Sequence, residues 1–407
     1  MSLQLNMLPA GEGDAFHLQW GPENDRRQLI IDMGVRATGR NLRSHIKSLP
    51  EAERSFDLLV VTHVDTDHIY GVLSALVDPE AVTGFVFDDV WFNGWTHLNG
   101  GSVDSFAPSC TGTDAHLLAE ARAHLFGTEL ESYGGRQGEE FSIWLRQQPW
   151  NRAFQGGPVV RPDDQVGPPV SLAHGLTLTV LGPTLDQLAA LKPEWRKAVA
   201  DALKKGTLSA DDVHEDLVPT DLEPMGRKKP RKPRFDSAQQ LKKLADTDFE
   251  SDSTAANGSS IALLAEYEGD KVLFAGDAHP AGLVEALNRL SPSEPLELSA
   301  FKLPHHGSKN NVSRELVEAV RCRHWLISTN GIKHYHPDAE AIARVLQYGD
   351  HPDAGAEKLI LLFNEPSTFN GWWSDENWGR RFCYEAHYGD ETRGLKLEIN
   401  DGRISVI

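Results

Sequence analysis

The sequence predicts an α/β (α+β) fold, an αββα sandwich in which two sheets lie between outer helices. Two β-rich halves carry this pattern, and a polar stretch of about residues 205–256 separates them. In the first half, the run FDLLVVTH at residues 56–63 is apolar at most positions, as in a strand that is covered on both faces. We expect a single domain over residues 1–407, with a flexible insertion at 205–256 and a β-rich C-terminal extension at 357–407.

The first half alternates short strands with helices. Alternating apolar residues predict strands in LQLNMLP, AFHLQW and RQLIIDMG, and residues 38–49 have the spacing of an amphipathic helix. Beyond the buried run, VTGFVFDDVWFNG predicts another strand and residues 114–126 a helix. The glycine cluster at residues 134–138 lacks the strand-to-helix setting of a dinucleotide-binding motif, and we interpret it as a loop.

The second half contains a similar series. GLTLTVLGPT predicts a strand and residues 185–204 a helix, while SSIALLAEYEGDKVLFAGD predicts two strands joined by a turn. The segments LELSAFKLPHHGS, residues 313–321 and HWLISTN predict a strand, a helix and a strand, and KLILLF and GLKLEI predict two later strands. Between the halves, Lys, Asp, Glu and Pro dominate residues 205–256, which leaves too little apolar surface for a core.

Composition excludes several classes of protein. With 40% hydrophobic and 24% charged residues the chain resembles a globular protein, and no apolar stretch approaches the roughly 20 residues that span a bilayer. The N-terminus lacks the basic and apolar regions of a signal peptide, so we expect a cytoplasmic protein. Three separated cysteines without CxxC spacing argue against a disulfide framework. The net charge of −19 argues against a broad nucleic-acid-binding face but permits a local positive groove.

The sequence Thr62-His63-Val64-Asp65-Thr66-Asp67-His68 directly follows the buried strand. It places four candidate metal ligands, His63, Asp65, Asp67 and His68, within six residues. Imidazole and carboxylate ligands suit zinc, manganese or iron, and a site without thiolates is unlike most structural zinc sites. A polar surface loop is the alternative interpretation, but the position after a buried strand favours a metal centre.

Together with this motif, GEGDAF, IDMG, LFAGDAH and LPHHGS occur in an order that resembles the metallo-β-lactamase superfamily of hydrolases. The resemblance extends from about residue 4 to about residue 345. It implies the αββα metallo-β-lactamase sandwich with two divalent metal ions, zinc or manganese. In that family the aspartate of the Gly-Asp turn bridges both metals, which corresponds to Asp277. A histidine after the next strand binds the second metal, here His305 or His306.

A closer resemblance is to the competence-type, ComEC-like hydrolase domains. The shared features are Asp65 in place of a second histidine, the segment Asn257-Gly258-Ser259-Ser260 before a strand, HHGS, and a later segment from Ser328 to Pro337. These domains resemble nucleases, so the resemblance implies hydrolysis of a nucleic acid or another phosphodiester. His336 in the later segment would then lie near the metals, where it can bind phosphate or protonate a leaving oxygen. A surface histidine in a turn is the alternative.

One family feature is missing. Many members carry a histidine in a P-G-H-T turn that completes the first metal site, and the corresponding Leu181-Gly182-Pro183-Thr184 has none. Either the first site has fewer protein ligands or another residue substitutes. His97 is a candidate substitute, although a histidine packed beside Trp95 is the stronger interpretation. A single-metal enzyme therefore stays open beside the dinuclear one.

The resemblance also implies a mechanism. Two metal ions about 3.5–4 Å apart would hold a bridging water, lower its pKa and stabilise the charge that develops at the reacting centre. Asp67 and Asp277 would fix the nucleophile, and Lys309 or His336 would neutralise the oxyanion. We therefore expect Asp67, His336 and Lys309 to be the catalytic residues.

The basic run from Arg227 to Arg234 lies inside the expected insertion. The simplest interpretation is a solvated part of a flexible loop. A guide for nucleic acid near the active site is the second interpretation. The third is a regulatory site at which a protease or a regulatory protein acts on residues 205–256, since exposed Lys/Arg loops are easily cut.

Three functions stay open on the sequence. The first is a metal-dependent nuclease or phosphodiesterase. The second is a hydrolase of a small ester or lactone, which the acidic net charge and the versatility of the fold permit. The third is a non-catalytic metal-binding regulatory protein, against which the intact Asp67, His68, Asp277 and His306 argue. Nothing in the sequence indicates an oligomeric state.

Overall fold

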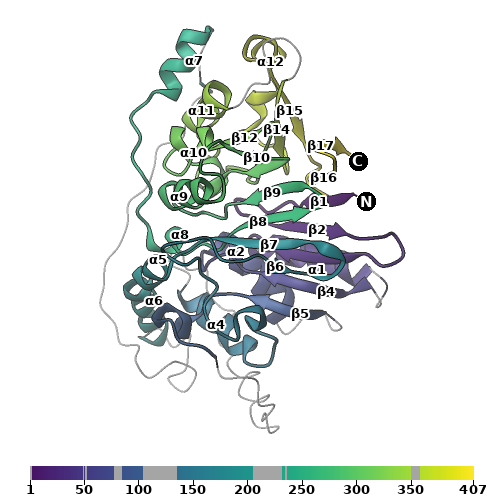
Figure 1. The fold of residues 1–407 in the computed structure, drawn as a ribbon, viewed down its shortest axis with the longest axis vertical. Coiled ribbons are helices and arrows are strands. Elements are labelled where there is room, and N and C mark those ends of the chain that lie inside the picture. Colours follow the sequence, from purple (N-terminus) through teal and green to yellow (C-terminus); the bar gives the residue numbers. More distant parts are fainter. Residues whose placement is uncertain are drawn as a thin grey trace.

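The computed structural model describes residues 2–48, 50, 53–77, 85–103, 135–204, 232–233, 236–349 and 358–407. Its centre is formed by a seven-stranded and an eight-stranded sheet, with helices around them (Figure 1). A small two-stranded sheet joins β10 (Leu296–Leu298) to β12 (Val320–Cys322). None of the described helices is both long enough and apolar enough to cross a membrane.

The seven-stranded sheet contains strands from both ends of the chain. Its order is β17-β16-β1-β2-β3-β4-β5. The strands are β1 (Leu3–Met7), β2 (Phe16–Trp20), β3 (Arg27–Ile31), β4 (Ser55–Val60), β5 (Val86–Trp91), β16 (Leu395–Asn400) and β17 (Arg403–Val406). Strands β3, β4 and β5 are parallel, and the remaining neighbours are antiparallel. Because β1 pairs with β16, the two termini lie near each other (Figure 1).

The eight-stranded sheet is formed by the second half of the chain. Its order is β15-β14-β13-β11-β9-β8-β7-β6. The strands are β6 (Val170–Ser171), β7 (Thr177–Gly182), β8 (Ala262–Tyr267), β9 (Asp270–Phe274), β11 (Ala300–Lys302), β13 (His324–Ile327), β14 (Leu359–Phe363) and β15 (Tyr384–Tyr388). The strands from β15 to β9 are parallel, and those from β9 to β6 are antiparallel.

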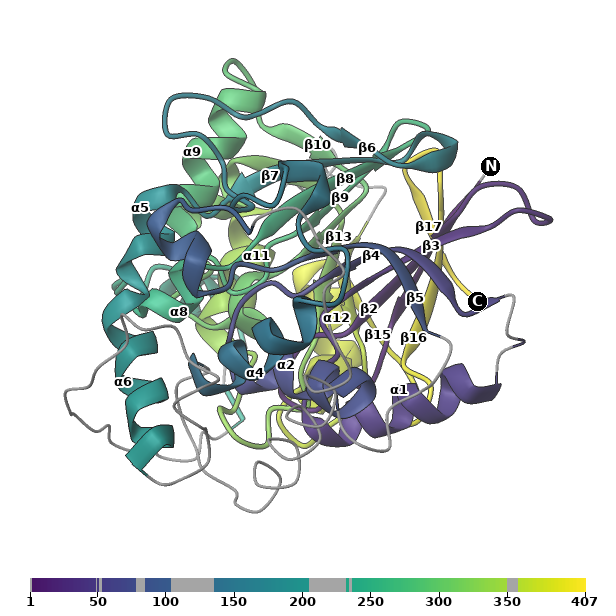
Figure 2. The same cartoon turned by 90° about the horizontal axis from the view of Figure 1, so that it is seen from below.

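Helices cover the outer face of each sheet. Those beside the seven-stranded sheet are α1 (Arg36–Ser48), α2 (Thr66–Val72), α4 (Gly135–Leu145) and α6 (Lys192–Lys204), and α5 (Leu185–Ala190) precedes α6. Those beside the eight-stranded sheet are α7 (Ala238–Ala245), α9 (Pro280–Leu290), α10 (Arg314–Glu318), α11 (Ala339–Tyr348) and α12 (Glu376–Phe382). The short α8 (Ala255–Gly258) precedes β8. Figure 2 shows α1 and α9 on opposite sides of the strands.

Three apolar clusters define the layers. Between the sheets, inward-facing side chains of both sheets, such as Leu58 and Leu263, form the central core. On the outer faces, Leu59 packs in the cluster of α1, α2, α4 and α6, and Phe301 in that of α7, α9, α10 and α11. The adjacent Leu58 and Leu59 thus bury both faces of β4, as the apolar run predicts. The predicted sandwich of two sheets between helices is confirmed.

Part of the expected flexible insertion has a defined structure. Helix α7 lies inside it and buries Leu241 and Ala245 against the cluster that includes α11. Arg344 of α11 donates to the carbonyls of Ala245 and Thr247. The packed helix within residues 236–256 was thus not predicted from the sequence. Residues 205–231, with most of the basic run, lie outside the described residues, and action of a protease or partner on them stays a prediction.

The C-terminal segment belongs to the two sheets and is not an extension. From residue 358 onward, β14 and β15 complete the eight-stranded sheet and β16 and β17 the seven-stranded one. The interpretation of the glycine cluster as a loop is wrong for residues 135–138. Residues 135–145 form α4, because Phe141 and Leu145 have helical spacing and pack into the outer core. The helix expected at 114–126 lies outside the described residues.

Candidate metal centre

Several loops meet at one edge of the sandwich. Asp32 follows β3, His63–His68 follows β4, Asp277 follows β9, His305 and His306 follow β11, and Ser328–His336 follows β13. Parallel strands end at a common edge, so their carboxyl ends bring these loops together. Asp14 joins them from the turn before β2, since β2 is antiparallel to β3 and begins where β3 ends.

Four buried residues form a group with the spacing of a metal site. One ligand atom of each of Asp14, His68, Asp277 and His306 lies within 4.8 Å of the others. The four residues are at most 2% exposed. His68, Asp277 and His306 were predicted as ligands, whereas Asp14 was not. The described residues therefore include a buried aspartate and histidine cluster that can bind a metal ion.

Asp277 lies at the centre of the contacts. Its Oδ1 is 3.4 Å from Nε2 of His68, and its Oδ2 is 3.4 Å from Nε2 of His306 and 4.0 Å from Nε2 of His63. Asp67 Oδ2 is 3.2 Å from Nε2 of His306. Two donors that bind one tetrahedral zinc ion lie about 3.4 Å apart, so these separations fit shared coordination.

The unpartnered atoms of the cluster give a test of whether a metal fits. Among the described residues, Nε2 of His63, His68 and His306 and Oδ1 of Asp277 have no hydrogen-bond partner, although all four atoms are buried. Buried polar atoms nearly always have a partner, and each such atom left without one costs about 1–3 kcal/mol. Divalent cations bound among these atoms would satisfy them, so the residues fit a metal.

The second nitrogen of each buried histidine is held by a neighbour. His68 Nδ1 is 2.7 Å from Oδ2 of Asp32, which also accepts a hydrogen bond from the Thr62 hydroxyl. His306 Nδ1 is 2.9 Å from the Ser328 carbonyl oxygen. An Nδ1–H that donates to a carboxylate or carbonyl leaves the Nε2 lone pair directed at the cluster. Both rings are thereby held in the form that can bind a metal.

The charges of the cluster favour a cation. Burial alone would raise the pKa of Asp67 and of Asp277, but the nearby His68 and His306 rings outweigh burial and lower both. Burial alone would lower the pKa of His68 and of His306, but Asp277 and further carboxylates raise both well above 6.5. Carboxylate charge that attracts protons to these rings also attracts a divalent ion, which displaces the protons when it binds.

His63 and Asp65 form a second group of donors beside Asp277. His63 is buried, and its Nε2 lies 3.6 Å from Oδ2 of Asp65. The Asp65 side chain is 31% exposed and lies at the start of α2. His63 also contacts Asp277, whose carboxylate contacts His68 and His306 as well.

The structure separates His305 from His306. His306 belongs to the buried group of four, whereas the His305 side chain is 25% exposed. Nε2 of His305 is 3.9 Å from Oδ2 of Asp277, and its Nδ1 is 2.9 Å from Oδ1 of Asn311. His306 is therefore the better placed ligand, and His305 lies on the more exposed side of the cluster.

A polar network supports His305. Oδ2 of Asp252 accepts hydrogen bonds from the side-chain amides of Asn257 and Asn311 and lies 3.5 Å from His305 Nδ1. Burial alone would raise the pKa of Asp252, but the hydrogen bonds from His305 and Asn257 lower it. Asp252 was not predicted, because it lies in the segment expected to be flexible.

The expected catalytic residues His336 and Lys309 lie at different distances from the cluster. His336 is buried, its ring centroid is 5.2 Å from that of His305, and burial lowers its pKa. The Lys309 ammonium is 3.6 Å from Oε1 of Glu340, and its side chain is 44% exposed. Lys309 thus pairs with a carboxylate of α11 rather than with the cluster, which differs from its expected role beside the substrate.

His97 is a packed histidine. Its Nδ1 accepts a hydrogen bond from the Gly94 amide, and its Nε2 is 3.0 Å from the Gly156 carbonyl oxygen. The ring meets Trp150 edge-on at 5.0 Å, and burial lowers the pKa of His97 to about 4. Because both nitrogens are used, His97 does not replace the missing family histidine.

Besides Asp252, three residues at the site were not predicted. Asp14 and Asp32 occur in GEGDAF and IDMG, segments that supported the resemblance without being assigned a role. Lys302 precedes LPHHGS and ion-pairs with Asp14. Nothing local in the sequence marks a lysine at the end of a strand as buried, because its partners are supplied by residues far away in the chain.

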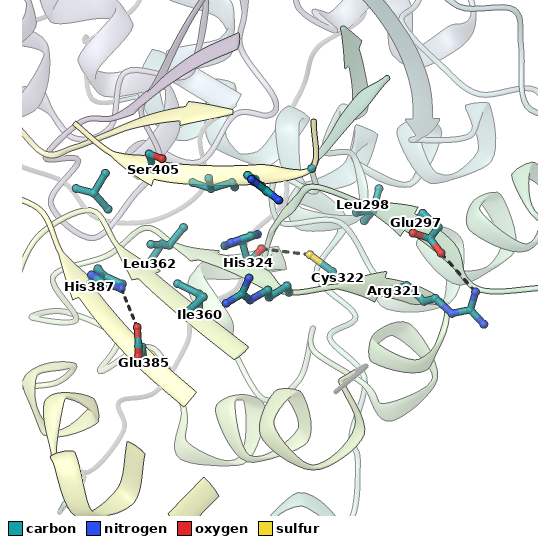
Figure 3. A pocket seen from close by; sticks show the side chains of 15 residues that line it. Glu297, Leu298, Arg321, Cys322, His324, Ile360, Leu362, Glu385, His387 and Ser405 are labelled. Atoms are coloured by element: carbon teal, nitrogen blue, oxygen red, sulfur yellow. Dashed lines mark hydrogen bonds and ion pairs between the residues drawn. The ribbon is translucent and has the colours of Figure 1, made fainter. Parts of the chain in front are cut away.

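A cavity of about 780 Å³ lies elsewhere (Figure 3). Its lining includes His324 and Ile360, near the beginning of β13 and β14, so it opens at the end of these strands opposite to the cluster. Its charged groups largely pair with each other or with nearby residues, as Arg321 does with Glu297. The cavity is therefore separate from the candidate metal centre.

Comparisons with known proteins do not extend this description. No protein-family model matches the chain, and no curated protein matches it significantly.

Proposed function

We propose that the chain is a metal-dependent hydrolase of the metallo-β-lactamase superfamily that cleaves phosphodiester bonds with two divalent metal ions. The convergence of the buried Nε2 atoms of His63, His68 and His306 on Asp277 carries the proposal. A donor set of imidazoles and carboxylates without thiolates suits zinc or manganese.

Formal charge supports two ions rather than one. The cluster and its immediate neighbours contain five carboxylates, those of Asp14, Asp32, Asp65, Asp67 and Asp277, and one ammonium, that of Lys302. The sum is a charge of −4, which two divalent cations neutralise and one does not. Buried charge without compensation is costly, so a filled dinuclear site is the favoured state.

The chain's own residues have distinct roles in this proposal. A bound pair of divalent ions supplies Lewis-acid activation of water and neutralises charge on a phosphoryl group. His63 and Asp65 would hold one ion, Asp67, His68 and His306 the other, and Asp277 would contact both. Asp32 and the Ser328 carbonyl orient the two imidazoles whose Nδ1 atoms they bind.

His305 is the residue best placed to exchange a proton with substrate. It is partly exposed, Asn311 holds its Nδ1, and its Nε2 lies near Asp277. A proton on Nε2 would pass to the leaving oxygen. The neighbouring ring of His336 packs against His305 and restricts its orientation. The resemblance to competence-type domains favours a phosphodiester over a small ester as substrate.

A substrate panel tests the proposal. Purified protein loaded with zinc or manganese would be assayed on single- and double-stranded DNA, bis(p-nitrophenyl) phosphate and p-nitrophenyl acetate. We expect metal-dependent cleavage of a phosphodiester, at a rate that falls at least about 100-fold in Asp277→Asn. The matched control is Lys243→Ala, which changes an exposed side chain of α7. Cleavage of the acetate ester alone would show an esterase and contradict the proposed phosphodiesterase activity. Metal binding without any cleavage would leave a regulatory protein.

A further inference from the structure

Lys302 is a fully buried cation beside the candidate metal centre. It is the last residue of β11 and 0% exposed. Its Nζ donates to the Gly276 carbonyl oxygen at 2.8 Å, ion-pairs with Asp14, and lies 3.6 Å from Oδ1 of Asp277. Two acceptors thus lie within hydrogen-bonding distance of the ammonium, and the Asp277 carboxylate lies at ion-pair distance.

Asp14 lies between Lys302 and His306. One carboxylate oxygen pairs with Lys302, and the other is 3.3 Å from Nδ1 of His306. The turn that contains Asp14 packs closely against the loop that contains Asp67, since a Cβ added to Gly13 would lie 1.6 Å from the Asp67 carbonyl oxygen. Asp14 therefore pairs with Lys302 through one oxygen, and its other oxygen, Oδ1, accepts no hydrogen bond in the described part of the chain and lies beside Nδ1 of His306 rather than beside Nε2.

We propose that Lys302 and Asp14 are a positioning pair that holds Asp277 and His306 in their metal-binding arrangement, and that neither is itself a ligand. The inference rests on the proposed metal site and adds to it the residues that organise it. Nδ1 of His306 is held by the Ser328 carbonyl, and the Asp14 carboxylate 3.3 Å away adds negative charge on that side of the ring, which favours coordination through Nε2.

The Gly276 carbonyl explains how one lysine links two loops. This oxygen accepts from Lys302 Nζ and also from the His305 amide at 3.1 Å. Gly276 precedes Asp277 and has a positive φ of 53°, so its carbonyl direction depends on an unusual turn. Lys302 thereby fixes the loop of Asp277 relative to the loop of His305 and His306.

Metal titrations distinguish a positioning pair from a pair of ligands. The variants are Lys302→Met, Asp14→Asn and their combination, measured by calorimetric titration of metal-free protein with manganese and by elemental analysis. We expect each single variant to weaken binding about 10–100-fold with an unchanged number of ions bound. The combined variant should lose less than the product of the single losses, because the pair acts as a unit. His68→Ala, which removes a ligand, should instead reduce the number of ions bound.

Two controls keep the outcome clear. Lys302→Met leaves the Asp14 carboxylate unpaired and can therefore fail to fold. In that case the test uses Asp14→Asn, which is nearly isosteric, and the combined variant, which has no unpaired charge. The inference is overturned if both bind manganese within about twofold of the wild type, or if Asp14→Asn lowers the number of ions bound. Absence of metal binding in the wild type would instead refute the proposed function.

Discussion

Buried histidines occur in two settings in this chain. His97 uses both ring nitrogens for hydrogen bonds to backbone groups, whereas His68 and His306 each keep an Nε2 without a hydrogen-bond partner in the described part of the chain. An imidazole with both nitrogens satisfied belongs to a packed core. One with a spare nitrogen beside carboxylates has the environment of a metal ligand.

His97 makes the folded state sensitive to acid. Burial lowers its pKa from 6.5 to about 4, so between these values the unfolded chain binds a proton that the folded chain does not. Stability contributed by neutral His97 is complete above pH 6.5 and is lost as pH falls towards 4, by about 3 kcal/mol in all. We expect His97→Gln to reduce this loss, measured by urea unfolding with chelator at pH 7 and pH 4.5. Equal pH dependence in both proteins would contradict the assignment.

The two adjacent histidines should differ in their effect on metal binding. His306 is buried beside Asp67 and Asp277, whereas His305 is partly exposed. We expect His306→Ala to weaken manganese binding by more than about 100-fold and His305→Ala by no more than about 10-fold. Calorimetric titration of the two variants compares them directly. The reverse order would exchange their roles.

Sequence predicted the local part of the site better than the distant part. His63, Asp65, Asp67 and His68 occupy one short loop, and a run of ligands after a buried strand is visible in one dimension. Asp14 and Lys302 are separated by most of the chain, and only the folded sheets bring them together. Lysine side chains are seldom fully buried, so the residue type gave no reason to expect Lys302 inside the protein.

Helix α7 lies in a segment whose average composition does not predict a packed helix. The surrounding segment is rich in charge and proline, which lowers its average hydrophobicity below that of a core segment. Within it, Leu241 and Ala245 lie four residues apart on one buried face, and Ser237 caps the helix by accepting from the Gln240 amide. The average composition of about 50 residues does not reveal the apolar spacing within this short helix.

Leu241 anchors α7. It is 4% exposed and packs in the cluster shared with α11. We expect Leu241→Ala to lower the free energy of unfolding by about 2–4 kcal/mol, because it removes buried apolar surface and leaves a cavity. Exposed Lys243→Ala is the control and should change stability by less than about 0.5 kcal/mol. Equal, small effects in denaturant titrations would show that α7 is not docked.

The C-terminal strands differ in their importance. In β16, Leu395, Leu397 and Ile399 are buried between the sheets, whereas β17 is largely exposed. Each buried aliphatic side chain contributes about 1.5–3 kcal/mol, so deletion of residues 395–407 should prevent folding. Deletion of residues 403–407 should leave cooperative thermal unfolding intact. A folded protein after the longer deletion would support the prediction from sequence that the C-terminal segment is an extension.

For the whole molecule, the layer arrangement was predictable and the strand order was not. Runs of alternating and continuous apolar residues identified most strands and the two-sheet sandwich. The pairing of β1 with β16 joins Leu3 to Ile399, and no local pattern indicates which strands become neighbours in a sheet. The return of the chain end to the first sheet therefore appeared only in the structure.

The metal content of the purified protein tests the central claim most directly. After reconstitution with zinc or manganese and removal of free ions, elemental analysis would compare the wild type with Asp277→Asn, whose carboxylate contacts both donor groups. Two equivalents of tightly bound metal in the wild type and a clear loss in the variant are expected. No retained metal in a folded wild-type protein would contradict the candidate centre and the hydrolase proposed from it.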